Sequence, residues 1–364
     1  MKKLVLIIFI WLITIFSVNK VSARILFDKT SYELPYRTPF AFSLAPLLNM
    51  DARLYLDIAC RGYSVRNGFD SRVFFPVYPL LIRTLSLNCL LNPVIIGLGV
   101  SILSFVGVLF ILSKMLKKNI RLKTLSLLLF FPTSFFFAAY YTESTFLLFV
   151  LLTFWFLDKK KYLPASVFAA LASATRLPGI VLAIVIFYEA YMDYRKNKKI
   201  HGEIFLAPLG LIFFSIYNWF STGSVLTFIT SQTYWNRPVG FSAPFYGLIR
   251  QAVNVFSGPL SSYDSPFVYP VILIEFGVFV YLLVILYFSY KKIKMSYWIY
   301  MLVSFVFILF AGPSSSPRYA LVLFPAFIYL GQKLSGLKYL TYLVCSYALF
   351  VFMACLFLRG YWSS

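Results

Sequence analysis

The chain has 364 residues, of which 61% are hydrophobic and only 12% are charged, and its formal net charge is +21 at pH 7. The charged fraction is roughly half that of an ordinary soluble domain, which argues against a water-soluble fold. Apolar runs of about 15 to 22 residues recur along the whole chain, which is the length at which a helix crosses a hydrocarbon core of about 30 Å. Strands of a membrane barrel would be shorter and alternating, so we predict an all-α, multi-pass membrane protein.

The first predicted span covers residues 4–18. Met1-Lys2-Lys3 and the apolar stretch up to Val18 fit a secretory signal, with Val21-Ser22-Ala23 as its cleavage site. They fit an uncleaved signal anchor equally well. We favour the anchor, because the topology derived below uses this segment as its first span.

Residues 19–91 form a long segment that we place outside the cytoplasm. Within it, residues 51–63 predict a short helix, since Leu54 and Ile58 follow helical spacing and Gly62 suits a C-terminal stop. Asp51 falls in the first turn, where the helix dipole favours an ionised carboxylate of the kind a general base needs. Asp57 is the alternative base. It lies about 240° further round an ideal helix, so both carboxylates cannot face one substrate atom, and we prefer Asp51.

The same outer segment continues with an aromatic turn and a second predicted helix. Residues 74–83 predict an amphipathic helix along the membrane surface. The alternative is an extra span over 75–92, against which Arg83 and Asn88 argue. Cys60 and Cys89 both fall in this segment, where they could form a disulfide or remain as two free thiols; the spacing does not decide.

Hydropathy predicts about eleven spans in total, two of which could be broken or re-entrant. After the first, they lie at 92–113, 124–139, 143–157, 163–175, 178–192, 204–220, 267–290, 295–311, 319–331 and 339–357. A second long outer segment covers 221–266. Together with 19–91 it is expected to cap a helical bundle, so that residues 1–364 form a single domain.

Lysine and arginine are distributed differently, and this sets the predicted orientation. Of the 19 lysines, 17 fall in alternate connections, which the positive-inside rule assigns to the cytoplasm. Of the 14 arginines, 12 fall on the other side or at its boundary. A planar guanidinium suits phosphate better than an ammonium does. We therefore interpret the lysines as topology signals and the arginines as candidate chemistry, although outer arginines also bind lipid headgroups or pair with acids.

Four motifs in chain order resemble one family, the PIG-V-like (GPI mannosyltransferase II-like) mannosyltransferases of the GT-C class. The first is M-D-A-R-L-Y-L-D-I-A-C-R-G-Y with F-F-P-V-Y-P-L-L-I-R, over residues 50–63 and 74–83. The others are Tyr141-Thr142-Glu143-Ser144, Thr175-Arg176-Leu177-Pro178-Gly179, and Pro317-Arg318-Tyr319 leading into Leu323-Phe324-Pro325. The predicted topology puts Asp51, Glu143, Arg176, Trp235-Asn236-Arg237 and Arg318 on the outer face.

The resemblance implies a GT-C-like bundle and the transfer of a hexose, expected to be mannose, with inversion at the anomeric carbon. The donor would be a polyprenyl- or dolichyl-phosphate sugar and the acceptor a lipid-linked molecule or glycan. Asp51 matches the family's loop aspartate and would deprotonate the acceptor. Arg176 or Arg318 would hold the phosphate, and the remaining candidate substrate contacts are Arg237, Glu143, Tyr55 and Tyr319.

The sequence departs from this family at Met50, where relatives usually carry Trp before the aspartate, so acceptor identity stays open. Several of the candidate side chains also have simpler interpretations. Glu143 and Arg176 could merely pair with each other, Trp235 is more simply an interfacial residue, and Glu275 is expected to face the bundle interior. Asp51, Asp57 and Asp70 have no recognised metal-site spacing, so no cofactor or metal is identified and a divalent-metal requirement stays open.

Two other functions compete with the enzyme. A transporter or flippase for a lipid-linked glycan should carry ionisable residues at mid-membrane depth, whereas the polar motifs here lie at one face. A non-catalytic subunit of a glycosylation complex is the third candidate. The expected partners are membrane lipids and the two substrates, and no nucleic acid. The expected location is the plasma membrane in a prokaryote or the endoplasmic reticulum in a eukaryote, with the site on the non-cytoplasmic face.

Overall fold

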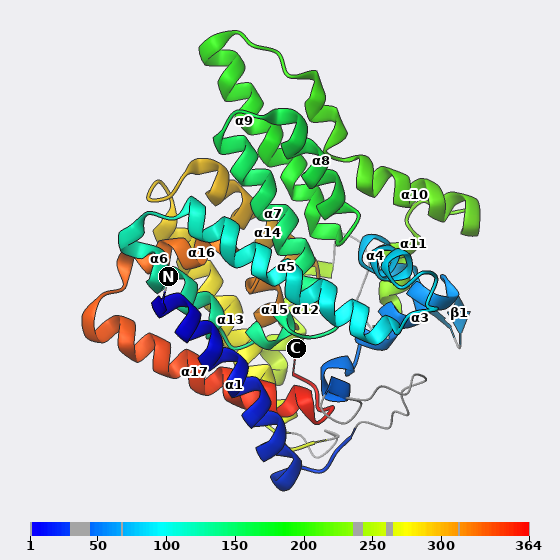
Figure 1. Cartoon of the computed structure of the whole chain (residues 1–364), viewed down its shortest axis with the longest axis vertical. Coiled ribbons are helices and arrows are strands. Elements are labelled where there is room, and N and C mark those ends of the chain that lie inside the picture. Colours follow the sequence, from blue (N-terminus) through cyan, green and yellow to red (C-terminus); the bar gives the residue numbers. More distant parts are fainter. Residues whose placement is uncertain are drawn as a thin grey trace.

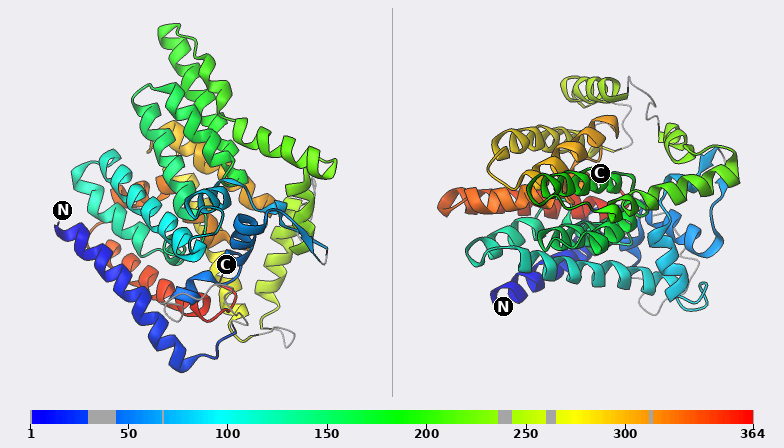
Figure 2. Two further views of the ribbon diagram at one scale, coloured as in Figure 1. Left: turned by 45° about the vertical axis from the view of Figure 1, so that its right-hand side comes forward. Right: turned by 90° about the horizontal axis from the view of Figure 1, so that it is seen from above.

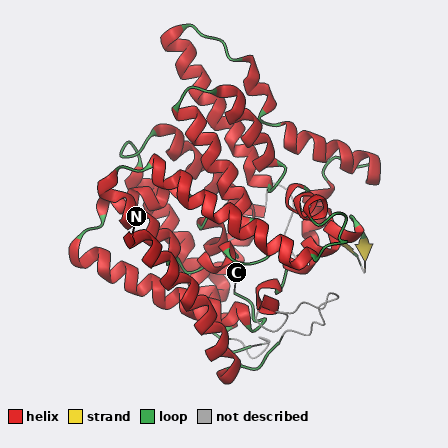
Figure 3. Ribbon diagram, in the orientation of Figure 1, coloured by secondary structure: helices red, strands yellow, loops and turns green. Residues whose placement is uncertain are grey.

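The computed structural model describes residues 2–29, 44–66, 68–235, 243–259, 265–311 and 314–363. In these residues the fold is almost entirely helical, with one small antiparallel hairpin of β1 (Val65–Arg66) and β2 (Phe69–Asp70) (Figures 1 and 3). Six helices are long and apolar enough to cross a membrane: α1 (Lys2–Ile25), α5 (Pro93–Met115), the segment Leu177–Asn197 ending in α9 (Val181–Asn197), the segment Gly202–Thr222 ending in α10 (Leu209–Thr222), α13 (Val268–Ser289) and α17 (Gly336–Leu358). The all-α class is thus confirmed and the six long apolar helices are compatible with a membrane protein, while the count of about eleven spans stays a prediction.

The N-terminal helix belongs to the bundle. α1 lies along α17, and Figures 1 and 2 show the two side by side at one edge of the molecule. Trp11 is buried, and its indole Nε1 donates a hydrogen bond to Ser134 Oγ at 3.1 Å. α1 also runs further than residue 18, so the segment predicted to lie outside would begin after Ile25 rather than at residue 19.

At the centre of the bundle, α7 (Glu143–Asp158) packs between α5 and α8 (Tyr162–Ser173). The predicted span at 124–139 is wrong in its second half, because α6 (Lys118–Leu129) ends at Leu129. Pro132 lacks a backbone N–H and cannot continue a helix. Residues 130–142 instead form a chain of turns around the short 3₁₀ helix Ser134–Phe137, and every one of them is buried. This segment brings the N-terminus of α7 into the interior.

The predicted span at 319–331 is also divided. α15 (Ser316–Ala320) and α16 (Phe324–Lys333) are separate helices joined by a turn, and Pro325 lies in the first turn of the second. α14 (Met295–Ala311) precedes them and is apolar, but it is shorter than the six long helices. Because of this break, Arg318 lies in the short helix α15 and not within one continuous helix.

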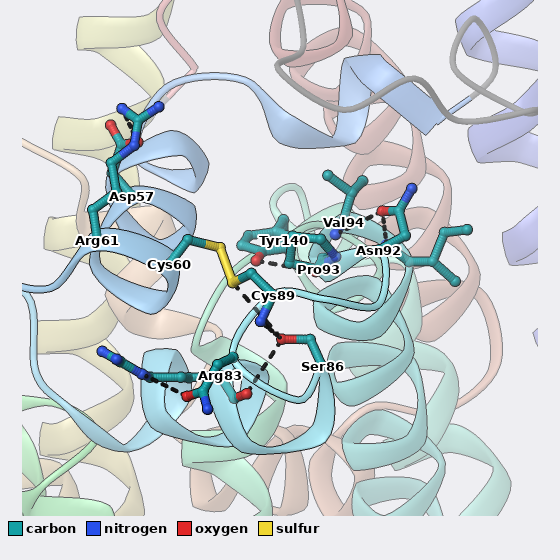
Figure 4. Close-up of a disulfide and its surroundings, with 12 residues drawn as sticks. Asp57, Cys60, Arg61, Arg83, Ser86, Cys89, Asn92, Pro93, Val94 and Tyr140 are labelled. Atoms are coloured by element: carbon teal, nitrogen blue, oxygen red, sulfur yellow. Dashed lines mark hydrogen bonds and ion pairs between the residues drawn. A yellow bond between two sulfur atoms is a disulfide. The ribbon is translucent and has the colours of Figure 1, made fainter.

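The described part of the first predicted outer segment contains two short helices. α3 (Ala52–Arg61) follows Asp51 directly and is capped at its C-terminus by Gly62, and α4 (Val77–Leu85) has one buried face. A disulfide between Cys60 and Cys89 joins the end of α3 to the turn before α5 (Figure 4). The alternative of an extra span over 75–92 is excluded, because α4 ends at Leu85 and the chain then turns. The disulfide thereby fixes α3 and α4 against the helical bundle.

Loss of this disulfide is expected to lower the free energy of unfolding by about 2–4 kcal/mol, because the bridge restricts the unfolded chain. Cys60→Ser tests this, and Cys345→Ser, which removes an exposed free thiol, is the matched control. Thermal unfolding of the purified protein with and without reductant gives the measurement. Equal stability of Cys60→Ser and wild type, or insensitivity of the wild type to reductant, would contradict the expectation.

The second outer segment contains more structure than a loop. α10 is followed by α11 (Thr227–Thr230), the 3₁₀ turn Ser231–Trp235 and the 14-residue helix α12 (Ala243–Phe256). α12 packs along α13 and α14. Its apolar residues Ile249, Val253 and Phe256 are exposed while Gln251 is buried against α13. The segment at 221–266 therefore extends the bundle as well as connecting it.

Ion pairs of different kinds are found at the two ends of α7. At its C-terminus, Asp158 pairs with Lys294 at 2.9 Å, and Lys294 also contacts the buried Glu189 of α9 at 2.6 Å. At its N-terminus, Glu143 pairs with arginines. Since α7 has 16 residues, at about 1.5 Å per residue its ends lie about 24 Å apart. Lysine pairs are thus found at one end of this helix and arginine pairs at the other.

Candidate active site

A cavity of about 490 Å³ brings together residues from distant parts of the sequence. Asp51 and Tyr55 line it from the start of α3, Arg176 from the turn after α8, and Arg318 and Tyr319 from α15. Much of the remaining wall is apolar, with contributions from the first outer segment, α11 and α14: Val73, Phe74, Phe75, Phe228, Ile229, Val306, Phe307, Ile308 and Phe310. A charged end and an apolar wall therefore share one space.

A continuous chain of four charges forms the polar end of this cavity. Arg318 Nη1 donates to Asp51 Oδ2 at 2.9 Å, and Arg318 Nε donates to Glu143 Oε1 at 2.7 Å. Arg176 Nη1 donates to the same oxygen of Glu143 and, at 3.3 Å, to Thr142 Oγ1. The order is Arg176, Glu143, Arg318, Asp51. Four residues from four separate segments of the sequence thus form one network.

Glu143 lies behind the arginines and away from the cavity. Its side chain is 0% exposed, whereas those of Arg176 and Arg318 are 10% and 14% exposed. One carboxylate oxygen accepts from both guanidinium groups, and the other, Oε2, has no hydrogen-bond partner among the described residues. Two cations fixed by one buried anion cannot move apart at low cost. Of the two interpretations of Glu143, pairing with Arg176 describes this geometry better than direct contact with a substrate.

Asp51 lies just before the first residue of α3 and is held there by hydrogen bonds of its backbone. Its N–H donates to Tyr141 Oη at 3.1 Å, and that hydroxyl donates to Asn49 O at 2.9 Å. Met50 just before it has φ 57°, in the left-handed region that is uncommon for a residue with a side chain. The Asp51 side chain is 28% exposed, more than the other members of the charge network. It is the carboxylate in this cluster that a substrate can reach.

Arg318 is positioned by contacts at the start of α15. Ser315 has φ 65°, and its N–H donates to Glu275 Oε1 at 2.9 Å. Ser316 Oγ donates to the backbone oxygen of Glu275, and Thr133 Oγ1 donates to Pro317 O at 2.8 Å. Glu275 is 2% exposed, which confirms that it faces the bundle interior. This carboxylate in α13 therefore holds the helix that carries Arg318.

Arg176 is fixed by the turn in which it lies. It precedes the 3₁₀ helix Leu177–Ile180, which packs directly on α8. A Cβ at Gly179 would lie 2.3 Å from the backbone carbon of Ala172, so only glycine allows this approach. The T-R-L-P-G motif is thus a close-packed turn that presents Arg176 to the cavity.

Burial alters the acid–base behaviour of two groups here. Burial alone would lower the pKa of the Arg318 guanidinium, but the Glu143 and Asp51 carboxylates reverse this and raise it well above its ordinary value. Burial raises the pKa of Tyr55 to about 12; Arg176 and Arg318 act against this rise, and Glu143 and Asp51 add to it. Tyr55 therefore keeps its proton near neutrality, and its hydroxyl lies 3.5 Å from Thr142 Oγ1. It is suited to hydrogen bonding rather than to acting as a base.

One predicted residue, Asp57, is not part of this arrangement. Asp57 lies on another face of α3, where it pairs with Arg61 at 3.3 Å near the disulfide, as Figure 4 shows. Its side chain is 47% exposed and does not line the cavity. Arg237 and Asn236 lie outside the described residues. The other six, Asp51, Tyr55, Glu143, Arg176, Arg318 and Tyr319, are in or directly behind the cavity wall.

Sequence reasoning missed several residues that complete the wall. Gln232, Ser304 and Trp362 line the cavity, and Met50, identified only as a departure from the family pattern, lines it as well. Gln232 follows α11 and Trp362 follows α17, so neither carried a spacing signal. No group of three or more His, Cys, Asp or Glu side chains in the described parts of the chain is arranged to hold a metal ion.

Comparison with family models, curated proteins and solved structures finds no match for this chain.

Proposed function

We propose that the protein is a glycosyltransferase that moves a hexose, with mannose as the expected sugar, from a polyprenyl- or dolichyl-phosphate donor to a lipid-linked or glycan acceptor. The observation that carries the proposal is a single cavity in which a reachable carboxylate, two guanidinium groups and an apolar wall meet. The reaction needs these three elements: a base, a phosphate holder and a surface for a lipid chain. The resemblance of the motifs to PIG-V-like enzymes supports the same reaction.

The two arginines are suited to the donor phosphate. Arg176 and Arg318 converge on Glu143, which fixes their separation before any ligand binds. Both line the cavity, so the faces turned away from Glu143 are open to an anion. Guanidinium groups form charge-assisted hydrogen bonds with phosphate, and preorganised donors stabilise a leaving group without further rearrangement.

Asp51 is suited to the acceptor. In the proposed reaction its carboxylate takes the proton of an acceptor hydroxyl as the oxygen attacks the anomeric carbon of the donor. The bond from that carbon to the phosphate oxygen breaks, and the phosphate leaves with the electron pair, held by Arg176 and Arg318. Attack opposite the leaving group inverts the anomeric centre. Tyr55, which keeps its proton, and Tyr319 remain as candidate sugar contacts.

The lipid part of the donor fits the apolar wall. Val306 and Phe310 of α14 line the cavity and are 39% and 45% exposed, so this wall is suited to contact with an isoprenoid chain and with membrane lipids. The Cys60–Cys89 disulfide supports an oxidising, non-cytoplasmic side for the cavity, and the lysines at the far end of α7 support a cytoplasmic side there. The proposed location is a membrane with the cavity on its non-cytoplasmic face.

A transporter or flippase for a lipid-linked glycan is the alternative. It would use an ionisable group deep in a span, and Glu275 of α13 is the residue to consider. Glu275 is already occupied in holding Ser315 and Gln251 at 2.9 and 3.3 Å, respectively. The reachable charges gather at one end of the cavity instead, which favours the enzyme.

Purified protein in lipid nanodiscs should transfer mannose from a polyprenyl-phosphate mannose to a panel of alkyl glycosides, with product formation followed by mass spectrometry. GDP-mannose without the lipid donor should give no product, because the cavity offers an apolar wall for a lipid. Asp57→Asn should behave as wild type, since that carboxylate is outside the cavity. Turnover with GDP-mannose alone, or no transfer from any polyprenyl-phosphate sugar, would refute the proposal.

A further inference from the structure

The two sides of the Arg318 guanidinium have unequal partners. Its Nε atom faces Glu143, which is fully buried, and its Nη1 atom faces Asp51, whose side chain is 28% exposed. An ion pair that is closed off from water is hard to break, because removing one partner leaves an uncompensated buried charge. A partly exposed pair is weak, and water can replace either partner. The contact with Asp51 is therefore the exchangeable one.

Asp51 occupies a position that conflicts with its proposed role. Its Oδ2 atom accepts a hydrogen bond from Arg318 Nη1 at 2.9 Å, and both side chains line the same cavity. A base must present its lone pairs to the acceptor hydroxyl, whereas this contact directs one carboxylate oxygen at a cation. The phosphate of the donor would approach the same guanidinium from the cavity. Carboxylate and phosphate thus compete for Arg318.

The backbone is anchored on both sides of this ion pair. Met50 and Ser315 both have left-handed φ values, 57° and 65°, a conformation found where the surroundings enforce it, often at ligand sites. The Asp51 N–H donates to Tyr141 Oη, and Ser315, Ser316 and Pro317 are hydrogen-bonded to α13 or to Thr133. A change of partner therefore falls to the Asp51 side chain, which is the more exposed of the two, while Arg318 stays on Glu143.

We infer that the Asp51–Arg318 ion pair is a latch that an anionic phosphate opens. The phosphate takes the place of the Asp51 carboxylate on Arg318, and the freed carboxylate turns to the acceptor. Donor binding and formation of the base are then one event, and the donor binds before the acceptor can react. The inference rests on the proposed function, because it assigns Arg318 to a phosphate and Asp51 to a hydroxyl.

The test measures binding rather than turnover, with geranyl phosphate as the probe. It carries an isoprenoid chain and a phosphate but no sugar. Calorimetric titration of the full-length protein gives its dissociation constant. Asp51→Asn removes the competing charge and should bind the probe about two- to five-fold more tightly than wild type, the range expected for a partly exposed ion pair. Asp57→Asn, on the same helix but paired with Arg61, should bind as wild type does.

A double-mutant cycle separates a latch from simple repulsion between two anions. If Asp51 acts through Arg318, its replacement should give no gain in an Arg318→Gln background. If Asp51 merely repels phosphate, the gain should persist there, and the latch would be refuted. Unchanged or weaker binding by Asp51→Asn would refute it too. If Asp51→Asn fails to insert, Asp51→Ser, which removes the same carboxylate, replaces it in the cycle.

The latch and the proposed function can fail separately. Tighter probe binding by Asp51→Asn, together with no sugar transfer by the wild type, would keep the latch and remove the glycosyltransferase. Sugar transfer by the wild type, with equal probe binding by Asp51→Asn, would keep the enzyme and remove the latch.

Discussion

Asp51→Asn is expected to lower turnover by about 10²- to 10⁴-fold, the typical contribution of a general base. The amide keeps the shape of the side chain but has no basic lone pair for the acceptor proton. Donor affinity should not fall, because the arginines that hold the phosphate stay on Glu143. Initial rates against donor concentration separate the two effects, since kcat should fall while KM for the donor does not rise.

Asp57→Asn is the matched control for this experiment. It changes the same chemical group in the helix that Asp51 precedes, but its carboxylate faces Arg61 and solvent. Its turnover should stay within a small factor of wild type. Near-normal turnover in a folded Asp51→Asn protein would remove Asp51 from its role and would favour a non-catalytic subunit. A larger loss in Asp57→Asn would instead require the base to lie outside the cavity.

Glu143→Gln should destabilise the protein by about 3–5 kcal/mol, the range for removing one partner of a buried ion pair. Arg176 and Arg318 would then meet without the anion that holds them together, and their side chains are only 10% and 14% exposed. Donor binding should weaken as well, since the separation of the two guanidinium groups is no longer fixed. Thermal unfolding gives the first effect and geranyl phosphate titration the second.

Glu189→Gln provides the comparison for that variant. Glu189 is also nearly buried and also contacts two cations, but Lys160 and Lys294 are 54% and 39% exposed and can turn to water. Its loss should cost less stability, and it should leave donor binding unchanged, since it pairs with Lys294 at the other end of α7. Equal effects of the two substitutions would mean that Glu143 acts only as a structural ion pair.

Hydropathy alone was sufficient to predict the all-α class and most of the long apolar helices. It failed at 130–142 because the apolar run continues past Leu129, and only Pro132 signals that the helix stops. It also failed at α12, where Arg250, Gln251 and Asn254 lower the average although Ile249, Val253 and Phe256 recur at helical spacing. Helices that are apolar on one face only are hard to separate from loops by average hydropathy.

The sequence was sufficient to predict which residues gather at the candidate site, but not which of them pair with each other. The topology and the motifs brought Asp51, Glu143, Arg176 and Arg318 to one side, and helix phase separated Asp51 from Asp57. Which arginine meets which carboxylate depends on how α15 and the 177–180 turn pack against α7, and neither follows from spacing. The sharing of one Glu143 oxygen by both arginines is a property of the packed structure.

The buried connection at 130–142 has a consequence for how this protein can vary. Connecting segments normally tolerate substitution and insertion because they lie on the surface. Here each residue is enclosed, and apart from one 3₁₀ turn the backbone forms no helix that would absorb an added residue by rotation. An inserted residue would displace Tyr141, and with it the hydroxyl that holds the Asp51 backbone. This stretch should therefore drift as slowly in evolution as the centre of a helix, although by its secondary structure it is a loop.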